Sequence, residues 1–223
     1  HGPWGEEYLD VNKYGIFRIF NKKIRDQMQL FVLKKSSQVF FVSEYMSTYV
    51  NNAFKYSPIK KKFYQLGPII EEIKIKNNFA KVSRINGVVI RRLVKRTGVL
   101  DLIEKLQKNK LSLDIDVIGS GNQIDRIKFL SKSSISKVSV RGSIDDFKKN
   151  QILKNSLVCI LPSVSLEGFG LVILEAISFG SVPIVSNKAG GGKDWLSSLD
   201  ENLIYDSSVE DLNRAINYVQ ENY

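Results

Sequence analysis

The sequence is poor in the residues that form disulfides, zinc sites and hydrolytic triads. It holds one cysteine, Cys159, and one histidine, His1. A disulfide within the chain needs two cysteines, and a zinc site needs several closely spaced Cys or His ligands, so both are excluded. A Ser-His-Asp hydrolase is disfavoured too, because no Gly-x-Ser-x-Gly turn accompanies the lone histidine. Cys159 lies in the apolar stretch "SLVCILPS", where we expect a buried core residue.

Long apolar runs are missing as well. No stretch reaches the roughly 18 apolar residues that a membrane-spanning helix needs. The opening residues, "HGPWGEEYLD", have neither the basic start nor the apolar core of a secretory signal peptide. We therefore expect a cytoplasmic protein. The chain begins with His1 rather than Met, so we expect the start of the natural protein to be missing.

The composition is that of an ordinary folded protein with an excess of cations. The 223 residues are 43% hydrophobic and 25% charged, which suits one large domain or one and a half smaller ones. A net charge of +10 favours polyanionic partners, namely nucleic acid, an anionic membrane face or phosphorylated substrates. Nucleic acid is the weakest of these candidates, because no basic motif is interleaved with aromatic residues.

A basic amphipathic helix is expected near the N-terminus. Lys and Arg gather at both ends of the stretch 22–35, and Ile24, Met28, Phe31 and Val32 recur within it at helical spacing. The interpretation that we favour is a solvated helix whose apolar stripe covers a core. The alternative is a helix that lies on an anionic membrane.

From about residue 86 onward, short apolar runs alternate with helical segments. This alternation predicts right-handed βαβ crossovers, and so an α/β fold with a doubly wound parallel sheet and helices on both faces. The expected strands are 87–90, 113–119, 137–142, 156–163 and 182–186. The expected helices are 98–109, 122–132, 145–155, 170–180 and 208–222. Ligands bind beyond the carboxyl ends of such strands, so the residues after each run form the candidate site.

Glycines and cations gather at these post-strand positions. The segments are "RRLVKRTG", "GSGN", "RGS", "PSVSLEGFG" and "SNKAGGGKD". Glycine lets backbone N–H groups approach a ligand closely, and helix N-termini carry about half a positive charge, so these turns suit phosphate oxygens. "GSG" alone is an incomplete dinucleotide fingerprint, which an ordinary strand-to-helix turn explains equally well. A nicotinamide dehydrogenase is therefore disfavoured.

Two glutamates frame the segment "EGFGLVILE". Glu167 lies in the loop before the helix expected at 170–180, and Glu175 lies between one and two turns inside that helix. Glu167 is expected to accept hydrogen bonds from sugar hydroxyls, and Glu175 from the two hydroxyls of a ribose. The plainer alternative is a helix-start acid together with one exposed glutamate. Within this set of post-strand residues we favour the binding roles.

The pattern Glu167-x7-Glu175, with "LPS" before it and "AISFGSVPIVSNKAGG" after it, resembles the signature of retaining GT-B-fold glycosyltransferases of family 4. The segments "RLVKRTGVLDLIEKL", "DIDVIGSG" and "VSVRGSI" follow in the family's order, and the resemblance covers roughly residues 85–205. It implies a hexosyltransferase-type enzyme that moves a sugar from a nucleotide-sugar donor to a saccharide or lipid-linked acceptor. The transfer would retain the anomeric configuration and need neither metal nor cofactor, with side-chain cations and helix N-terminal amides meeting the diphosphate charge.

The resemblance also implies roles for single residues. Arg92 would contact the diphosphate, Glu167 would act at the sugar, and His1 would be the histidine at the edge of the cleft. The further donor-binding residues implied are Lys95, Arg96, Thr97, Ser120, Gly121, Arg141, Gly168, Phe169, Gly170, Leu171 and Glu175.

Two positions depart from the family pattern. The family usually has Lys where this chain has Thr97, and a small residue where it has Arg91. The missing lysine is a second cation for the diphosphate. Lys95 and Arg96 are the candidate replacements, although a regular turn would point both elsewhere. Reduced activity, an altered donor and a degenerate protein all stay open at this point.

The N-terminal third resembles the family more loosely. "SSQVFFVSEYMSTYV" looks like the last strand and helix of the family's N-terminal domain. We expect residues 1–66 to be a remnant of an acceptor-binding Rossmann-like domain, 67–84 a linker, and 85–223 a C-terminal nucleotide-sugar-binding Rossmann-like domain. Two complete halves need roughly 300 residues, so we expect a fragment.

Other readings of the chain remain as alternatives. Asp114 and Asp116 form a D-x-D, the metal motif of the other large glycosyltransferase fold, but alternate positions in a strand face one side rather than a metal loop. The second candidate function is a noncatalytic or degenerate nucleotide-sugar-binding module or partner subunit. The setting implied by the family is surface polysaccharide or glycolipid synthesis, with peripheral contact to an anionic inner membrane face and no nucleic-acid partner.

Overall fold

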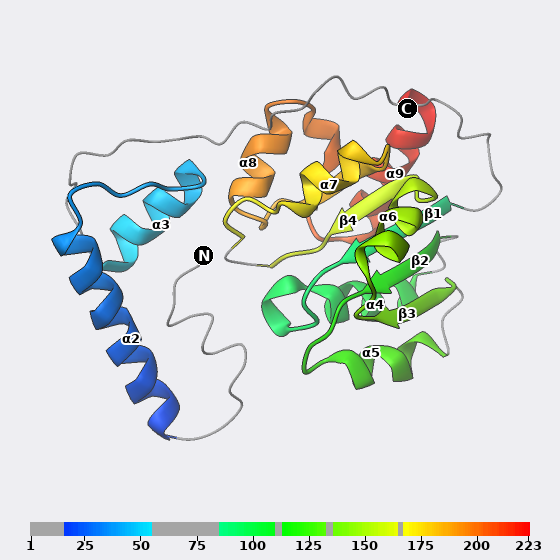
Figure 1. Ribbon diagram of the computed structural model, residues 1–223. Coiled ribbons are helices and arrows are strands. Elements are labelled where there is room, and N and C mark those ends of the chain that lie inside the picture. The colour runs from blue at the N-terminus through cyan, green and yellow to red at the C-terminus, as the bar shows by residue number, and fades with distance from the viewer. Residues whose placement is uncertain (1–15, 55–84, 110–112, 133–135, 165–166) are drawn as a thin grey trace.

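The computed structural model describes residues 16–54, 85–109, 113–132, 136–164 and 167–223. Two helices, α2 (Ile16–Lys35) and α3 (Glu44–Phe54), come first, and an α/β unit follows (Figure 1). His1 and the linker expected at 67–84 lie outside the described residues. The site must therefore be built from the α/β unit and the two N-terminal helices.

Six parallel strands form one sheet in the order β3-β2-β1-β4-β5-β6. Their bounds are β1 Ile85–Ile90, β2 Leu113–Ile118, β3 Val138–Gly142, β4 Val158–Leu161, β5 Val182–Ser186 and β6 Ile204–Tyr205. The strand order reverses between β1 and β4, which confirms the expected doubly wound parallel sheet. In such sheets ligands bind in the crevice at the reversal point, beyond the carboxyl ends of the strands.

Burial along the strands follows from their sequences. Every residue of β4 and β5 is buried, because these apolar, β-branched runs are covered on both faces. In β2 the apolar residues are buried, whereas Asp114 and Asp116 are only half-buried on the opposite face. Both aspartates therefore share one face of a strand, as expected. Among the described residues no group of three or more His, Cys, Asp or Glu is placed to hold a metal ion.

Helices cover both faces of the sheet (Figure 1). Their bounds are α4 Val99–Lys108, α5 Ile124–Ser131, α6 Asp146–Lys154, α7 Val172–Ser178, α8 Gly191–Ser197 and α9 Val209–Asn222, with short 3-10 turns at Lys95–Thr97 and Glu201–Leu203. Fully buried aliphatic side chains such as Ile103, Ile160 and Ile173 join helices and strands into one core. Cys159 lies in this core as expected, and burial raises the pKa of its thiol to about 12.

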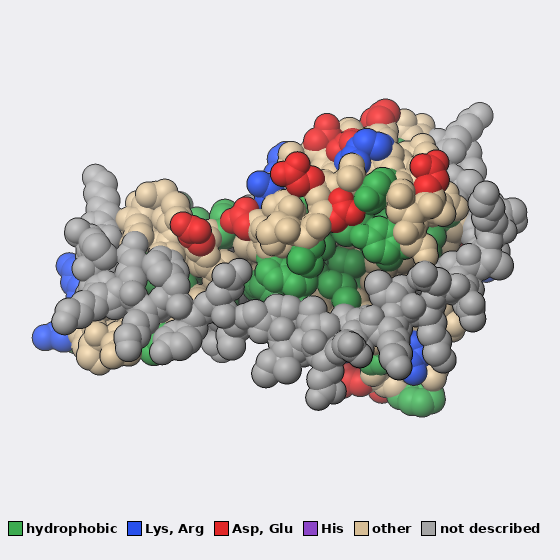
Figure 2. Space-filling model, turned by 90° about the horizontal axis from the view of Figure 1, so that it is seen from above, with side chains coloured by type: hydrophobic (Ala, Val, Ile, Leu, Met, Phe, Trp, Pro, Cys, Tyr) green, Lys and Arg blue, Asp and Glu red, His purple; other side chains and the backbone are tan. Residues whose placement is uncertain are grey.

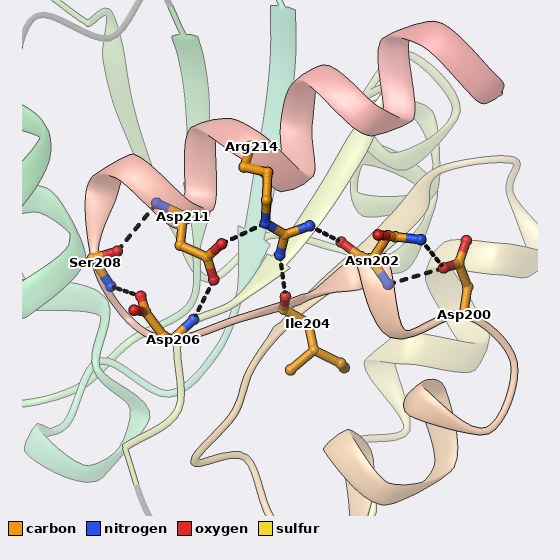
Figure 3. A network of polar contacts seen from close by, with 7 residues as sticks. All are labelled: Asp200, Asn202, Ile204, Asp206, Ser208, Asp211 and Arg214. Carbon is orange, nitrogen blue, oxygen red and sulfur yellow. Dashed lines mark hydrogen bonds and ion pairs between the residues drawn. The ribbon is translucent and has the colours of Figure 1, made fainter.

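A polar network fastens α9 to β6 (Figure 3). Ser208 caps α9 by accepting a hydrogen bond from the Asp211 N–H at 3.1 Å, and Asp211 forms an ion pair with Arg214. Arg214 also donates to the backbone carbonyl oxygens of Asn202 at 3.2 Å and Ile204 at 2.7 Å. The short edge strand β6 is thus held by side chains of α9 as well as by its pairing with β5.

The described surface seen in Figure 2 carries a group of acidic side chains, although the whole chain carries a charge of +10. Asp and Glu side chains gather there over the end of the α/β unit that holds α8 and α9. The described acids of that region are Asp194, Asp200, Glu201, Asp206, Glu210, Asp211 and Glu221. Among the described residues, several cations gather at the carboxyl ends of β1 and β2.

The structure differs from the sequence expectations at four places. It adds helix α8 and strand β6, which were not expected, and the helix expected at 170–180 begins at Val172. The strand implied at "VFFV" does not form: in the described stretch 36–43 no residue is in a strand, and every described strand lies beyond residue 84. A strand needs a neighbouring strand to pair with, and the described strands all belong to the sheet that begins at β1.

The basic helix α2 forms as expected, but its apolar stripe is not packed against a core. Ile24, Met28, Phe31 and Val32 are 42%, 56%, 63% and 48% exposed. The favoured interpretation, that this stripe covers a core, is therefore wrong for the protein as described. Of the helices in the described residues, none combines the length and apolar character that a membrane span requires.

Candidate functional site

A cavity of about 450 Å³ opens beyond the carboxyl ends of β1 and β2, next to the point where the strand order reverses. Its described lining residues are Ile90, Arg91, Arg92, Arg96, Thr97, Ile118, Gly119, Ser120, Ser143, Ile144, Lys149 and Glu167. The lining combines several cations with one carboxylate and few large apolar side chains. Such a cavity suits a polar, anionic ligand.

The "GSG" turn after β2 is explained by close packing of two backbones. The Arg91 N–H donates to the Ile118 carbonyl at 3.0 Å, and the Leu93 N–H donates to the Ser120 carbonyl at 2.8 Å. A Cβ on Gly119 would lie 1.9 Å from the Arg91 carbonyl oxygen, so only glycine fits there. The turn thereby fixes the segment that follows β1, and Ser120 lines the cavity.

Thr97 closes the turn that follows β1. Its Oγ1 lies 2.6 Å from the Arg92 carbonyl oxygen and 2.8 Å from the Val94 carbonyl oxygen, and its hydroxyl hydrogen can be donated to one of them at a time. Thr97 is buried and Lys95 is exposed. The turn brings Arg92 and Arg96 to the same cavity, whereas Lys95 is not among its described lining residues. The expectation that Arg96 points elsewhere is therefore wrong, because residues 95–97 form a 3-10 turn after an extended segment.

Glu167 meets Arg91 at the edge of this cavity. The Arg91 guanidinium forms an ion pair with Oε2 of Glu167 and donates to Ser163 Oγ at 2.8 Å, and Ser163 Oγ lies 3.3 Å from the same carboxylate oxygen. The Arg91 and Glu167 side chains are only 11% and 13% exposed. Burial lowers the pKa of Arg91 to about 10, with a smaller contribution from Arg96, so its guanidinium stays charged at neutral pH.

The glycine run after β5 packs against the loop that carries Glu167. An added Cβ would lie 2.6 Å from the Glu167 carbonyl oxygen at Gly190, and 2.1 Å from the Gly168 carbonyl oxygen at Gly191. Ser43, just before α3, donates from Oγ to the same Gly168 oxygen at 2.6 Å. These glycines were expected to approach phosphate oxygens. The contacts that the structure gives them are with the Glu167 loop.

Phe169 belongs to this packing rather than to the cavity. Its ring is 9% exposed and lies 5.7 Å from the Trp195 ring of α8, at an interplanar angle of 57°. Gly170 has a φ of 80°, a conformation that favours glycine, and Leu171 is 70% exposed at the start of α7. The loop between β4 and α7 is thus held by its backbone and by Phe169.

Glu175 reaches the cavity through a lysine that the sequence analysis missed. Lys149 of α6 lines the cavity, and its Nζ lies 3.0 Å from Oε2 of Glu175 and 3.0 Å from Oδ1 of Asp146. The hydrogen bond to Glu175 raises the pKa of Lys149. Glu175 itself is not among the described lining residues. A lysine in the helix that follows a post-strand glycine turn was the available signal.

Arg141 lies apart from the other predicted residues. Its Nε forms an ion pair with Asp116 Oδ1 at 2.6 Å, and it lines a second cavity of about 310 Å³ together with Asp114 and Lys137. This cavity includes Asn86, near the start of β1. The structure therefore does not bring Arg141 to the first cavity, because its side chain pairs along the face of the sheet.

The predicted residues thus fall into groups. Those that line the first cavity are Arg92, Arg96, Thr97, Ser120 and Glu167. Gly121 follows the lining residue Ser120 in sequence, Gly168, Phe169, Gly170 and Leu171 follow Glu167, and Glu175 pairs with the lining residue Lys149; none of these six is among the described lining residues. Those placed elsewhere among the described residues are Lys95 and Arg141. His1 lies outside the described residues. Arg91 was noted only as a departure, and Ser163 and Lys149 were missed.

A family model, a curated protein and several solved structures are similar to this chain. A family model described as "Glycosyl transferases group 1" matches residues 70–223. A curated relative, the phosphatidyl-myo-inositol mannosyltransferase of Propionibacterium freudenreichii subsp. shermanii, is 33% identical over 94 residues, which are 41% of this chain and 21% of the relative. The chain therefore spans about a fifth of the length of this relative.

Solved structures with the same fold cover more of the chain. WaaG, a glycosyltransferase involved in lipopolysaccharide biosynthesis, matches with a TM-score of 0.68 and 15% identity over 99% of this chain and 64% of its own. The catalytic domain of cholesterol-α-glucosyltransferase from Helicobacter pylori matches with a TM-score of 0.54 and 22% identity over 63% of this chain and 88% of its own. A glycosyltransferase from Rickettsia africae ESF-5 matches with a TM-score of 0.64 and 15% identity, over 95% of this chain and 65% of its own.

Proposed function

The chain belongs to the glycosyl transferases group 1 family, and we propose that it carries the donor-binding half of a retaining, metal-independent glycosyltransferase. Its structural neighbours are GT-B glycosyltransferases, so the expected fold class is confirmed. The observation that carries the proposal is the cavity at the sheet reversal, whose described lining includes the cations Arg91, Arg92, Arg96 and Lys149 and the carboxylate of Glu167.

The cations of the cavity suit a diphosphate. Arg92 and Arg96 both line it from one turn, and the buried hydroxyl of Thr97 keeps that turn closed. Guanidinium groups form paired hydrogen bonds with phosphate oxygens, and Lys149 of α6 adds a point charge to the lining. We assign the diphosphate of a nucleotide-sugar to Arg92 and Arg96. Ser120 offers a hydroxyl at the end of β2 for the nucleoside side.

The carboxylates suit the two sugars of such a donor. Glu167 lines the cavity as an ionised acceptor beside the arginines, so it is placed for the hydroxyls of the transferred sugar. Glu175 is half-exposed and tied to Lys149, and we assign it to the ribose.

The chemistry follows from these assignments. The bond between the sugar's anomeric carbon and the diphosphate oxygen breaks, and a bond to an acceptor hydroxyl forms on the same face of the ring. The acceptor proton leaves with the diphosphate, whose developing charge is met by Arg92, Arg96 and Lys149. Preorganised cations in a partly enclosed cavity lower the cost of this charge without a metal ion. The acceptor, a saccharide or a lipid-linked group, would meet the donor outside the cavity.

Ligand binding to the chain tests the donor site. Thermal unfolding is followed with UDP, GDP and ADP, each with and without magnesium. A ligand at a hundred times its Kd stabilises the folded state by about 2.7 kcal/mol, so a bound nucleoside diphosphate gives a clear rise in Tm. We expect one of the three to bind without magnesium. A rise that appears only with magnesium contradicts metal independence, and no rise with any of them contradicts the donor site.

Two arginine variants sharpen this test. Arg92→Gln removes a cation from the cavity, and Arg141→Gln removes one from the separate cavity on the sheet face. We expect the first to weaken nucleoside diphosphate binding about tenfold or more, since a charge-assisted hydrogen bond is lost. We expect the second to leave binding within about twofold. Equal losses in both variants would move the site away from the first cavity.

A noncatalytic nucleotide-sugar-binding module is the second candidate. The observation that favours it is Thr97, whose hydroxyl contacts two backbone carbonyl oxygens at a position where a further cation was expected. The two functions differ in turnover rather than in binding. Release of nucleoside diphosphate from a bound nucleotide-sugar in the presence of a lipid-linked or saccharide acceptor supports the enzyme, whereas tight binding without release supports the module.

Helix α2 suits contact with an anionic membrane. It exposes Phe20, Met28 and Phe31 at 61%, 56% and 63%, and Lys34 and Lys35 end the same helix. We propose that this helix brings the chain to lipid-linked acceptors. Co-sedimentation with phosphatidylglycerol vesicles should weaken in Phe31→Ser and not in Phe129→Ser, a matched change at a phenylalanine that is 73% exposed on α5. Equal binding of the two variants contradicts the proposal.

A further inference from the structure

We infer that Arg91 is a positioning residue, which holds the Glu167 carboxylate in place for the sugar half of the donor and does not itself bind the diphosphate. The inference rests on the proposed function. It concerns a position where the sequence analysis found only an unexplained arginine. It implies a division of labour between two adjacent residues, with Arg91 acting for the sugar and Arg92 for the diphosphate.

The three partners come from segments that the fold fixes next to one another. Arg91 follows β1 and Ser163 follows β4, and these strands are neighbours in register, with Gly87 opposite Val158. The Arg91 N–H is held by the Ile118 carbonyl at 3.0 Å, and Ser163 is fully buried. Arg91 and Ser163 lie within two residues of a strand end, whereas Glu167 lies farther along the loop after β4. The carboxylate is therefore docked onto two residues that are themselves anchored to the sheet.

The contacts form a closed set around one carboxylate oxygen. Arg91 donates to Ser163 Oγ at 2.8 Å, Ser163 Oγ lies 3.3 Å from Oε2 of Glu167, and Arg91 pairs with that same Oε2. Among the described residues both contacts of the Glu167 side chain go to Oε2. An ionised carboxylate accepts hydrogen bonds at both oxygens, so capacity for a sugar hydroxyl is retained.

The buried Nε of Arg91 indicates which partner sets the orientation of the guanidinium. Its Nε is buried and has no hydrogen-bond partner among the described residues. An unsatisfied buried donor is unfavourable, and the guanidinium accepts this penalty while it contacts Ser163 and Glu167. The orientation is therefore the one that serves the carboxylate.

Electrostatics separates Arg91 from its neighbours. Burial and the nearby Arg96 lower the pKa of Arg91, so a third guanidinium at this place is costly by itself. The Glu167 carboxylate offsets that cost, and the pair contributes no net charge. A neutral pair attracts a diphosphate weakly, whereas Arg92 and Arg96 line the cavity from the turn. Loss of Arg91 should accordingly weaken binding of the sugar and not of the diphosphate.

The test compares a nucleoside diphosphate with its sugar derivative. Dissociation constants are measured by calorimetry for UDP and UDP-glucose, and for GDP and GDP-mannose, with the complete chain. For the pair that binds, the dissociation constant of the nucleoside diphosphate is divided by that of the nucleotide-sugar. This ratio reports what the sugar adds to binding. In Arg91→Gln we expect this ratio to fall about tenfold, the effect of losing a hydrogen bond to a charged group, while binding of the diphosphate alone changes by less than about twofold. Glu167→Gln should lower the same ratio.

Further variants fix the cause. In Arg92→Gln we expect the diphosphate affinity to fall and the ratio to stay. The double change Arg91→Gln with Glu167→Gln should lower the ratio little more than either single change does, because the two residues act as one unit. Ser163→Ala removes one contact of the set and should lower the ratio less than Arg91→Gln does. Arg91→Lys keeps the charge without the planar fork and should restore part of the ratio.

Each outcome decides the matter. If Arg91→Gln weakens the diphosphate alone as much as Arg92→Gln does, or if the Arg91 and Glu167 effects add fully, the inference is overturned. Should Arg91→Gln fail to fold, Ser163→Ala and Arg91→Lys carry the test, and an unchanged ratio in both overturns it. If the unmodified chain binds none of the four ligands, the proposed function fails, and the failure is distinct from that of the Arg91 assignment.

Discussion

Replacing Gly191 with alanine tests how tightly the Glu167 loop is packed. The new Cβ would lie 2.1 Å from the Gly168 carbonyl oxygen and 2.4 Å from Ser43 Oγ, which hydrogen-bond to each other at 2.6 Å. The loop, α3 and α8 cannot all keep their places. We expect the loop to move away from α8, and Glu167, which directly precedes Gly168, to move with it.

The magnitude can be worked from these contacts. Overpacking of a well-filled site costs about 1–3 kcal/mol, and loss of the Ser43 hydrogen bond costs about 1 kcal/mol more. Alanine gains about 1 kcal/mol over glycine in a helix, and Gly191 is the first residue of α8. The free energy of unfolding should therefore fall by about 1–3 kcal/mol, measured by urea titration.

A second glycine provides the control. Gly180, at the end of α7, has a φ of 83°, and among the described residues nothing lies within 4 Å of a Cβ added there. Gly180→Ala should cost about 1–2 kcal/mol through its left-handed backbone and leave nucleotide-sugar affinity unchanged. Gly191→Ala should weaken that affinity as well. If Gly191→Ala matches the unmodified protein in both stability and affinity, the packing argument for the glycine run is wrong.

Three further predictions concern the turn that Thr97 closes, the cavity residue Lys149, and the stability of the protein at low pH. Thr97→Val should lower the free energy of unfolding in urea by about 1–2 kcal/mol and Thr97→Ser should not, because only serine keeps a hydroxyl for the two carbonyl oxygens. Lys149→Gln should weaken nucleoside diphosphate binding about tenfold in calorimetry, whereas Lys148→Gln, at a side chain 70% exposed, should not. Burial raises the pKa of Asp200, but hydrogen bonds from Asn202 and two tyrosines lower it by more, so this pKa lies below its usual value. The stabilisation from Asp200 is therefore present above about pH 4 and lost as pH falls through the lowered pKa, so Asp200→Asn should flatten the loss of Tm below about pH 4.

The parallel sheet could be predicted because its strands are short apolar runs separated by helical segments of ordinary length. These features are local in sequence. They are clearest in the apolar runs of β4 and β5, where every residue is buried. Helix α8 was missed because it opens with Gly191 and Gly192, residues of poor helix propensity. Its glycines are required by neighbours from distant segments, which no local pattern reveals. Strand β6 was missed because it is only two residues long and depends on α9 side chains.

The candidate site was predicted in part for a similar reason. Arg92, Ser120 and Glu167 follow strands, and topology alone brings such residues to one edge. The roles of Thr97 and Lys149 depend on where single atoms lie, Thr97 on two backbone carbonyl oxygens and Lys149 on Glu175. Side-chain direction in a turn depends on its exact backbone path, so the expectation for Arg96 assumed a regular turn and was wrong.

The Arg91–Glu167 pair marks the reversal of the sheet. In the order β3-β2-β1-β4-β5-β6 the reversal lies between β1 and β4, and Arg91 follows the first of these strands while Glu167 follows the second. Helices leave these strands toward opposite faces, so a crevice opens between the two carboxyl ends. The Arg91–Glu167 ion pair joins the segments that follow these two strands. A smaller residue at 91 would leave Ser163 as the one described side-chain contact of the Glu167 carboxylate, so Arg91 adds an anchor with a full charge.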